Sequence, residues 1–143
     1  MIVRRVTGEE LRFIKSYAPI VQQEATLGYM NGNSLVMNEE MIYFHKAEYL
    51  ALFDHHRICG WILVGETNSP VEPDPIGMIL ELFVLPSYRK KGCGHTLMTN
   101  AISYFKQKNY KKVQLNVFAG NHAKKLYDQL GFKAVSTIME RPI

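Results

Sequence analysis

Residues 82–97 read LFVLPSYRKKGCGHTL. This stretch predicts a strand that ends at Pro86, a turn with three cations and two glycines, and then an amphipathic helix. The first amides of a helix have no intrahelical acceptor, and the macrodipole makes that end positive. A pyrophosphate placed there would accept several N–H bonds, and side chains at positions 92 and 94 would block its approach. The stretch therefore predicts a site for a phosphate-bearing ligand.

Two common phosphate-binding motifs do not match this stretch. A P-loop requires G-x-x-x-x-G-K-[ST], and the sequence contains no such run. A dinucleotide fingerprint requires a third small residue, but Gly92-Cys93-Gly94 is followed at that position by Leu97. What remains is Arg-x-x-Gly-x-Gly, from Arg89 to Gly94, at a strand–helix junction.

The pattern resembles the GNAT superfamily of N-acetyltransferases, whose R/Q-x-x-G-x-G/A loop grips the pyrophosphate of coenzyme A. In the family, the segment Y/F-V-x-P-x-Y-R leads directly into this loop, and residues 83–89 match that segment. The family's late signature A-x-x-L-Y-x-x-x-G-F is matched by Ala123, Leu126, Tyr127, Gly131 and Phe132. The strong resemblance covers about residues 77–135, whereas residues 1–76 agree only in their order of elements.

The resemblance implies that acetyl-CoA is the co-substrate. The amides of residues 91–96 would hold the pyrophosphate, and the backbone of residues 83–85 would pair with the pantetheine arm. That strand is expected to splay from the strand at 113–118, and the Val84 amide would polarise the thioester carbonyl. The residues assigned to the coenzyme are Phe83, Val84, Leu85, Arg89, Lys90, Lys91, Gly92, Cys93, Gly94, His95, Thr96 and Asn121.

Asn121 is a departure from the family pattern. The family has asparagine three residues before the alanine of the late signature, and here that position is Gly120. Either the loop is one residue shorter and Asn121 still reaches the pantetheine arm, or the contact is lost.

Glu81 and Tyr127 are the candidate catalytic residues. An amine attacks a thioester only when neutral, and a carboxylate in an apolar strand could take its proton, so Glu81 is the candidate base. A thiolate leaving group needs a proton, which the Tyr127 phenol could give. A tyrosine buried on the apolar face of a helix would show the same sequence spacing as a catalytic one. A glutamate on the solvent-exposed side of a strand would likewise look the same as a base. Both non-catalytic alternatives therefore stay open.

The acceptor is expected to be a primary amine on a small molecule, a peptide N-terminus or a protein lysine. The segment that would line its pocket contains Glu24 and Tyr29 as candidate substrate-binding residues. Residues 1–85 carry 6 Lys/Arg and 11 Asp/Glu, a net charge of −5, whereas residues 86–143 carry 11 and 2, a net charge of +9. The acidic half favours a cationic acceptor, and the basic half suits a polyanionic coenzyme better than a nucleic acid. A non-catalytic acyl-CoA sensor of the same fold is the alternative.

The remaining periodicities predict one α/β (α+β) domain over residues 1–143. We expect a mixed sheet of six to seven strands flanked by about four helices. Strands are predicted around residues 2–6, 49–53, 58–64, 77–85, 113–118 and 135–139. Helices are predicted after a capping box at residues 7–10, within residues 20–47, and at residues 94–108 and 122–130, the last closed by Gly131.

Composition favours a soluble cytoplasmic protein. The chain has 143 residues, 47% of them hydrophobic, which is enough for one substantial core. No apolar run reaches the roughly 18 residues that a membrane span needs. Cys59 and Cys93 are expected to be reduced thiols, and the scattered histidines predict no metal site. A homodimer is compatible with the sequence but not indicated by it.

Overall fold

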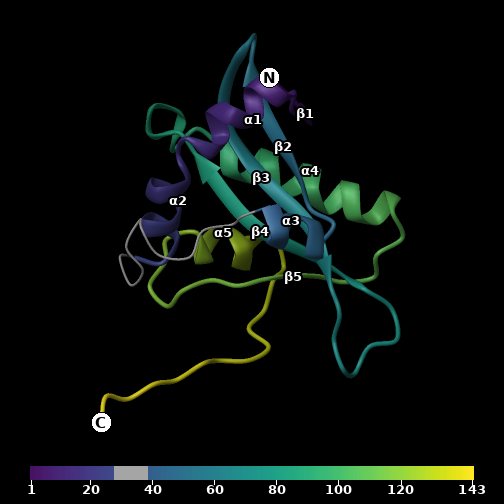
Figure 1. Ribbon diagram of the computed structural model, residues 1–143. Coiled ribbons are helices and arrows are strands. Elements are labelled where there is room, and N and C mark those ends of the chain that lie inside the picture. The colour runs from purple at the N-terminus through teal and green to yellow at the C-terminus, as the bar shows by residue number, and fades with distance from the viewer. Residues whose placement is uncertain (28–38) are drawn as a thin grey trace.

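The computed structural model describes residues 1–27 and 39–143 as an α+β fold (Figure 1). The strands are β1 (Ile2–Arg5), β2 (Glu48–Asp54), β3 (Arg57–Thr67), β4 (Ile76–Val84) and β5 (Val113–Leu115). The helices are α1 (Gly8–Lys15), α2 (Ala18–Ala25), α3 (Glu39–Phe44), α4 (Cys93–Gln107) and α5 (Lys124–Gln129), with a 3₁₀ turn at Pro86–Tyr88.

The strands form one mixed sheet in the order β1-β2-β3-β4-β5. Neighbours from β1 to β4 are antiparallel, and β5 is parallel to β4. The β4–β5 register runs only from Gly77 opposite Val113 to Ile79 opposite Leu115. Because β4 continues to Val84, the second half of its edge away from β3 pairs with no strand of the described residues and forms an open edge. The predicted splay between these two strands is therefore present.

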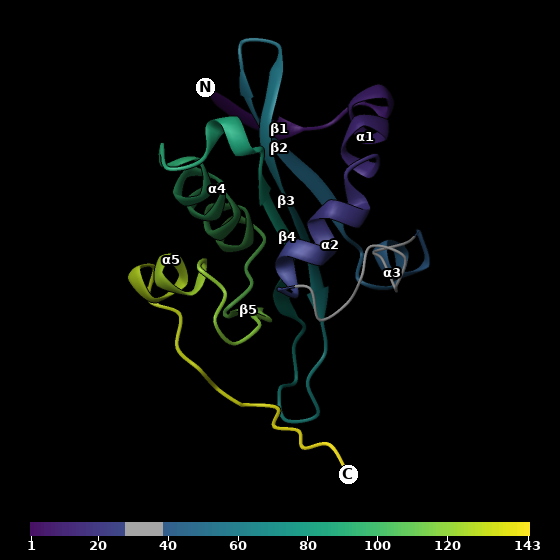
Figure 2. The same cartoon turned by 90° about the vertical axis from the view of Figure 1, so that its left-hand side faces the viewer.

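Helices cover both faces of the sheet (Figure 2). One face packs against α4 through Leu97, Met98 and Phe105, together with residues of β2 to β4. The other face, toward α1 and α2, contains Trp61 and Phe83. The strand β3 lies in the middle and is buried on both faces, which explains its continuous apolar run.

The prediction of six to seven strands and about four helices is wrong for the described residues, which form five strands and five helices. The missing strand is the one expected at residues 135–139, which the structure leaves extended and without strand pairing. Val135 is 80% exposed and Ile138 97% exposed, and this segment runs away from the sheet (Figure 1). β-prone residues alone do not make a strand, because a strand also needs a neighbour to satisfy its backbone groups.

Within residues 1–27 and 39–47 the structure forms three helices, α1 to α3, where the sequence predicts two. The capping box is confirmed, because the Glu10 amide donates to Thr7 Oγ1 at 3.3 Å and the Thr7 amide donates to Glu10 Oε1 at 2.8 Å. However, α1 ends at Lys15, and Pro19 lies in the first turn of α2. Proline fits there because the amide it lacks would have no helical acceptor.

The end of α5 confirms the predicted glycine cap. Gly131 has φ +89°, its amide donates to the Asp128 carbonyl at 3.1 Å, and the Phe132 amide donates to the Tyr127 carbonyl at 3.0 Å. These two bonds form a Schellman motif. The Phe132 and Tyr127 rings lie 6.1 Å apart, so the cap also holds the Tyr127 ring against the core.

Gly131→Ala is expected to lower the free energy of unfolding by about 1 kcal/mol, because the Cβ atom of alanine makes the left-handed backbone conformation at this position unfavourable. Gly8→Ala is the matched control. An added Cβ meets nothing within 4 Å at Gly8, and alanine favours a helix, so the control should be neutral or slightly stabilising. Urea denaturation measures both changes, and equal effects would contradict this account of the cap.

None of the helices that the structure describes combines the length and apolarity needed to cross a membrane.

Candidate active site

The end of β4 directs backbone groups into the open edge. The Leu85 amide donates to the Cys59 carbonyl of β3 at 2.9 Å. Because successive residues of a strand point their backbone groups to opposite sides, the amide and carbonyl of Val84 point away from β3. The Val84 carbonyl accepts a bond from Arg89 Nε at 2.8 Å. The Val84 amide thus faces the gap, where the predicted thioester contact requires it.

The N-terminus of α4 offers open amides. Its first bond of helical spacing runs from the Thr96 amide to the Gly92 carbonyl at 3.0 Å, so the amides of residues 92–95 have no acceptor within the helix. No acidic residue lies in the first turn. Gly92 has φ +82°, and an added Cβ there would meet nothing within 4 Å. These features fit a pyrophosphate group.

Different features of the structure explain why glycine occurs at positions 92 and 94 of the loop. Gly92 is required by its left-handed backbone and leaves the helix end uncovered. At Gly94, an added Cβ would lie 3.3 Å from Leu126 Cδ2 of α5. Gly94 therefore serves the packing of α4 against α5, a reason that the motif alone did not reveal. Cys93, between them, has its side chain buried in the core.

The cations of the loop do not all face the helix end. Arg89 Nη2 lies 2.7 Å from Glu24 Oε2 of α2, and its guanidinium lies 5.2 Å from the Phe83 ring centroid. Lys91 Nζ is 5.9 Å from the Tyr88 ring centroid, and Lys90, like Lys91 and His95, is exposed. Arg89 thus joins the end of β4 to α2, and Lys90 and Lys91 remain exposed beside the helix end.

Asn121 connects the two layers at the other end of the gap. Its Nδ2 donates to the Ala25 carbonyl at the end of α2 at 3.1 Å, and its Oδ1 accepts from the Ala123 amide at 2.9 Å. Both polar groups of the side chain therefore have partners within the protein. Contact of Asn121 with a pantetheine arm stays a prediction.

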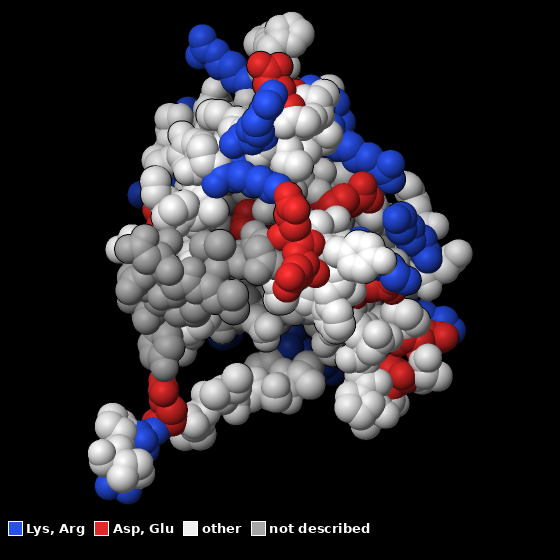
Figure 3. Space-filling view, viewed as in Figure 1, with Lys and Arg blue, Asp and Glu red and all other residues white. Residues whose placement is uncertain are grey.

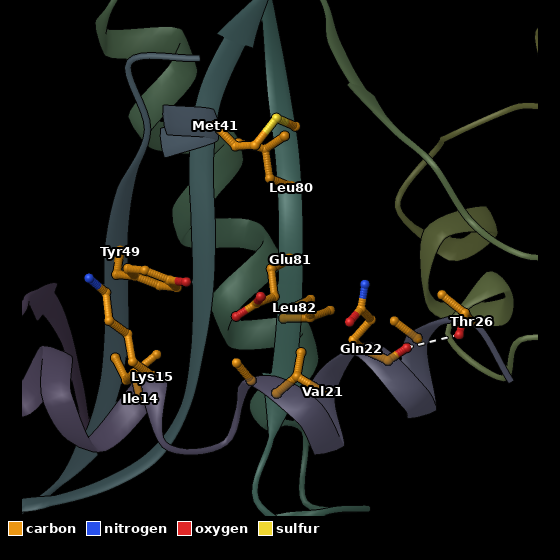
Figure 4. A pocket seen from close by; sticks show the side chains of 12 residues that line it. Ile14, Lys15, Val21, Gln22, Thr26, Met41, Tyr49, Leu80, Glu81 and Leu82 are labelled. Carbon is orange, nitrogen blue, oxygen red and sulfur yellow. Dashed lines mark hydrogen bonds between the residues drawn. The ribbon is translucent and has the colours of Figure 1, made fainter. Parts of the chain in front are cut away.

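A cavity of about 210 Å³ lies between α1, α2 and β4 (Figure 4). Most of its walls are apolar, and its polar side chains come from α1, α2, β2 and β4. The described residues that line it are Ile14, Lys15, Ala18, Val21, Gln22, Ala25, Thr26, Met41, Tyr49, Leu80, Glu81 and Leu82. Glu24, predicted for this pocket, is not among them, and Tyr29 lies outside the described residues.

Among the described residues that line this cavity, Glu81 is the only acidic side chain. Burial raises the pKa of its carboxyl group, and a hydrogen bond from Trp61 partly opposes this by stabilising the charged form. Trp61 Nε1 donates to Glu81 Oε2 at 2.8 Å. The Tyr49 hydroxyl points toward the same carboxylate (Figure 4), and burial, followed by the Glu81 charge, raises the pKa of Tyr49.

The sequence did not reveal this bond. Trp61 is fully buried, and its indole also orients the carboxylate. A lone glutamate in an apolar strand was the available signal, because a buried carboxylate needs a donor from a neighbouring strand.

Tyr127 lies on the opposite side of the sheet, on α5. Its ring packs on the core beside α4, and burial raises the pKa of its phenol. The phenol therefore stays protonated at neutral pH and is able to donate a proton. The two candidate catalytic residues thus stand on opposite layers, with the open edge of β4 between those layers.

The profile of the acetyltransferase (GNAT) domain matches residues 16–142. The chain belongs to the GNAT acetyltransferase family. An uncharacterized N-acetyltransferase of Methanocaldococcus jannaschii is 36% identical over 76 residues, which is 52% of this chain and 31% of that protein. The chain thus matches about a third of the length of that curated GNAT relative.

Solved structures share the GNAT fold. A putative acetyl transferase from Pyrococcus furiosus is 25% identical with a TM-score of 0.69, covering 99% of this chain and 100% of that one. A GCN5-related N-acetyltransferase from Ralstonia eutropha is 21% identical, with a TM-score of 0.73 over 99% and 97% of the two chains. An aminoglycoside N-acetyltransferase in complex with CoA is 14% identical, with a TM-score of 0.71 over 99% and 98%.

Proposed function

We propose that this GNAT protein is an acetyl-CoA-dependent N-acetyltransferase that moves the acetyl group directly to a primary amine. The observation that carries the proposal is the position of Glu81. It is a half-buried carboxylate, held by Trp61, in a cavity against β4, and the open edge of that strand leads to the uncovered N-terminus of α4.

Glu81 supplies the base. An alkylammonium group must lose a proton before its nitrogen can attack, and a carboxylate with a raised pKa is a stronger base than an exposed one. The Trp61 bond fixes one carboxylate oxygen at 2.8 Å and so orients the group. The proton would pass from the amine to Glu81, directly or through water.

Val84 and Tyr127 act on the other reactant. Bound acetyl-CoA would supply a thioester whose carbonyl carbon accepts the amine. The Val84 amide, which points into the gap, donates to the carbonyl oxygen as negative charge develops there. Tyr127 gives its proton to the departing sulfur, and its raised pKa keeps that proton available.

The coenzyme-binding loop is built from the start of α4. The open amides of residues 92–95 would hold the pyrophosphate, and Lys90 and Lys91 add positive charge beside it. Arg89 is occupied by Glu24 and by the Val84 carbonyl, so we assign it to joining this loop to α2 as well as to the phosphate.

The surface charge supports a cationic acceptor. On the face that carries α1, α2 and α3, acidic side chains gather near the middle, and Lys and Arg lie around them (Figure 3). An ammonium group that approaches this face meets negative charge close to the cavity of Glu81.

The test is amine-dependent release of the CoA thiol from acetyl-CoA, measured with a panel of primary amines and with tertiary amines as controls. We expect release with primary amines alone, because only they retain a proton to lose after attack. Saturable acetyl-CoA binding without release by any amine would overturn the proposal and favour the acyl-CoA sensor.

Tyr127→Phe is expected to lower kcat about tenfold and leave the KM for acetyl-CoA nearly unchanged. The effect is smaller than the ~100-fold or more typical of acid catalysis, because a thiolate needs less help from an acid than most leaving groups. Phenylalanine keeps the ring that packs on Phe132. Tyr43→Phe, at an exposed side chain of α3, is the control. Unchanged kcat in Tyr127→Phe would remove the acid role.

A further inference from the structure

Gln22 carries a buried oxygen that lacks a hydrogen bond. Its Oε1 is enclosed beside the cavity, and among the described residues no donor reaches it. The backbone carbonyl of Gln22 is satisfied, because Thr26 Oγ1 donates to it at 2.9 Å. Buried polar atoms normally have partners, so an unpaired side-chain acceptor indicates that a donor from outside the chain completes the site.

Three side chains that carry oxygen atoms line the cavity. The carboxylate of Glu81, the amide oxygen of Gln22 and the hydroxyl of Tyr49 come from three elements and line the same space (Figure 4). Trp61 already donates to Glu81 Oε2. An alkylammonium group offers three N–H donors and no acceptor, which matches three oxygen atoms. A neutral hydroxyl or amide ligand would offer fewer donors and leave the carboxylate charge uncompensated.

The apolar walls of the cavity restrict the size of the group that is attached to the ammonium nitrogen of the ligand. They are formed by Ile14, Val21, Met41, Leu80 and Leu82, with two alanines. A volume of about 210 Å³ is below the ~300–1,000 Å³ of sites for drug-sized ligands. A small alkyl group therefore fits between the described walls, and a drug-sized one does not.

Lys15 is the only cation that lines the cavity among the described residues. Its Nζ lies 3.7 Å from Glu39 Oε1 of α3, so part of its charge is neutralised at the rim. A second positive charge on the ligand near Lys15 would be repelled. The tail of the ligand is therefore expected to be uncharged.

We propose that this cavity takes the ammonium group of a small alkyl monoamine, with Gln22, Glu81 and Tyr49 as its hydrogen-bond partners. This inference rests on the proposed function, because it names the acceptor class of the same site. It assigns Gln22 as a specificity-determining residue that the sequence pattern did not single out as a site.

The fluorescence of Trp61 allows ligand binding at this site to be measured without catalysis. It is the single tryptophan of the chain, and its indole bonds to Glu81. Titration with n-butylamine should give a saturable change in tryptophan fluorescence, and n-butanol should give none at the same concentrations. Calorimetry with the same two ligands gives a second readout that is independent of the indole.

Gln22→Met removes the acceptor at nearly constant volume and is expected to weaken n-butylamine binding about tenfold or more, since a hydrogen bond to a charged group is lost. Gln23→Met, one residue along α2 and exposed, is the matched control and should bind as the wild type does. If Gln22→Met does not fold, Gln22→Glu keeps the shape, adds a charge and should tighten binding.

The outcomes separate this inference from the transferase proposal. Binding of n-butanol as tight as that of n-butylamine, an equal affinity in Gln22→Met, or no binding by both methods would overturn the inference, even if other amines are acetylated. Binding of n-butylamine that depends on Gln22, without any release of the CoA thiol, would support the site and overturn the transferase.

Discussion

Glu81→Gln is expected to lower kcat/KM for the amine by about 100-fold or more, the range that positioned acid–base groups contribute. Glutamine cannot take the proton that the ammonium group must lose. Its side-chain carbonyl can still accept the bond from Trp61 Nε1, which reaches Glu81 at 2.8 Å, so the fold and the cavity should be kept. Steady-state kinetics at saturating acetyl-CoA measure the loss.

Glu9→Gln is the control for this variant. Glu9 is exposed in the first turn of α1, away from the lining of the cavity, and its change should leave kcat/KM within error. Equal activity of Glu81→Gln and wild type would show that another group, or solvent, takes the proton.

The pH profile gives a second measure of the same group. Burial raises the pKa of Glu81 above its ordinary value near 4.5, and only the deprotonated carboxylate acts as a base. Activity should therefore fall as the pH decreases through that raised pKa. In Glu81→Gln this acidic limb should be absent from the residual activity, because the group that titrates is gone.

Gly92→Asp is expected to weaken acetyl-CoA binding by about 100-fold, because a carboxylate at the start of α4 would repel the pyrophosphate. Two like charges about 4 Å apart repel by about 4 kcal/mol at an effective dielectric constant of 20, and salt reduces this figure. Space is available, since an added Cβ at position 92 meets nothing within 4 Å. Calorimetric titration with acetyl-CoA measures the effect.

Gly92→Asn separates charge from backbone strain. Asparagine has the same shape as aspartate, and both residues tolerate the left-handed conformation that Gly92 adopts at φ +82°. The asparagine variant should lose much less affinity than the aspartate variant, and the difference between the two measures the effect of the charge. Similar losses in both variants would mean that the backbone, and not a phosphate group, explains the glycine.

Local sequence signals predicted the parts of the site that depend on few neighbours. The turn before α4 and the cap at Gly131 each follow from glycine conformation and helix-end chemistry, and both are confirmed. The position of Glu81 in an apolar strand was also visible in the sequence. Each of these features is fixed by residues close together in the chain.

Features that depend on distant partners could not be predicted in the same way. The segment 135–139 has strand-like residues but no partner strand, and it is not a strand in the structure. Glu24 was expected in the acceptor pocket, but it pairs with Arg89, which is 65 positions away in the sequence. The bond from Trp61 to Glu81 joins two strands whose register the sequence does not specify.

The most direct test of the central claim uses acetyl-CoA labelled with ¹³C in the acetyl group, an excess of n-butylamine, and mass spectrometry of both the amine and the protein. We predict labelled N-butylacetamide in amounts equal to the CoA released, with no acetyl group on the protein. Release of CoA without the labelled amide, or an acetylated protein that passes its label to the amine, would contradict direct transfer to an amine.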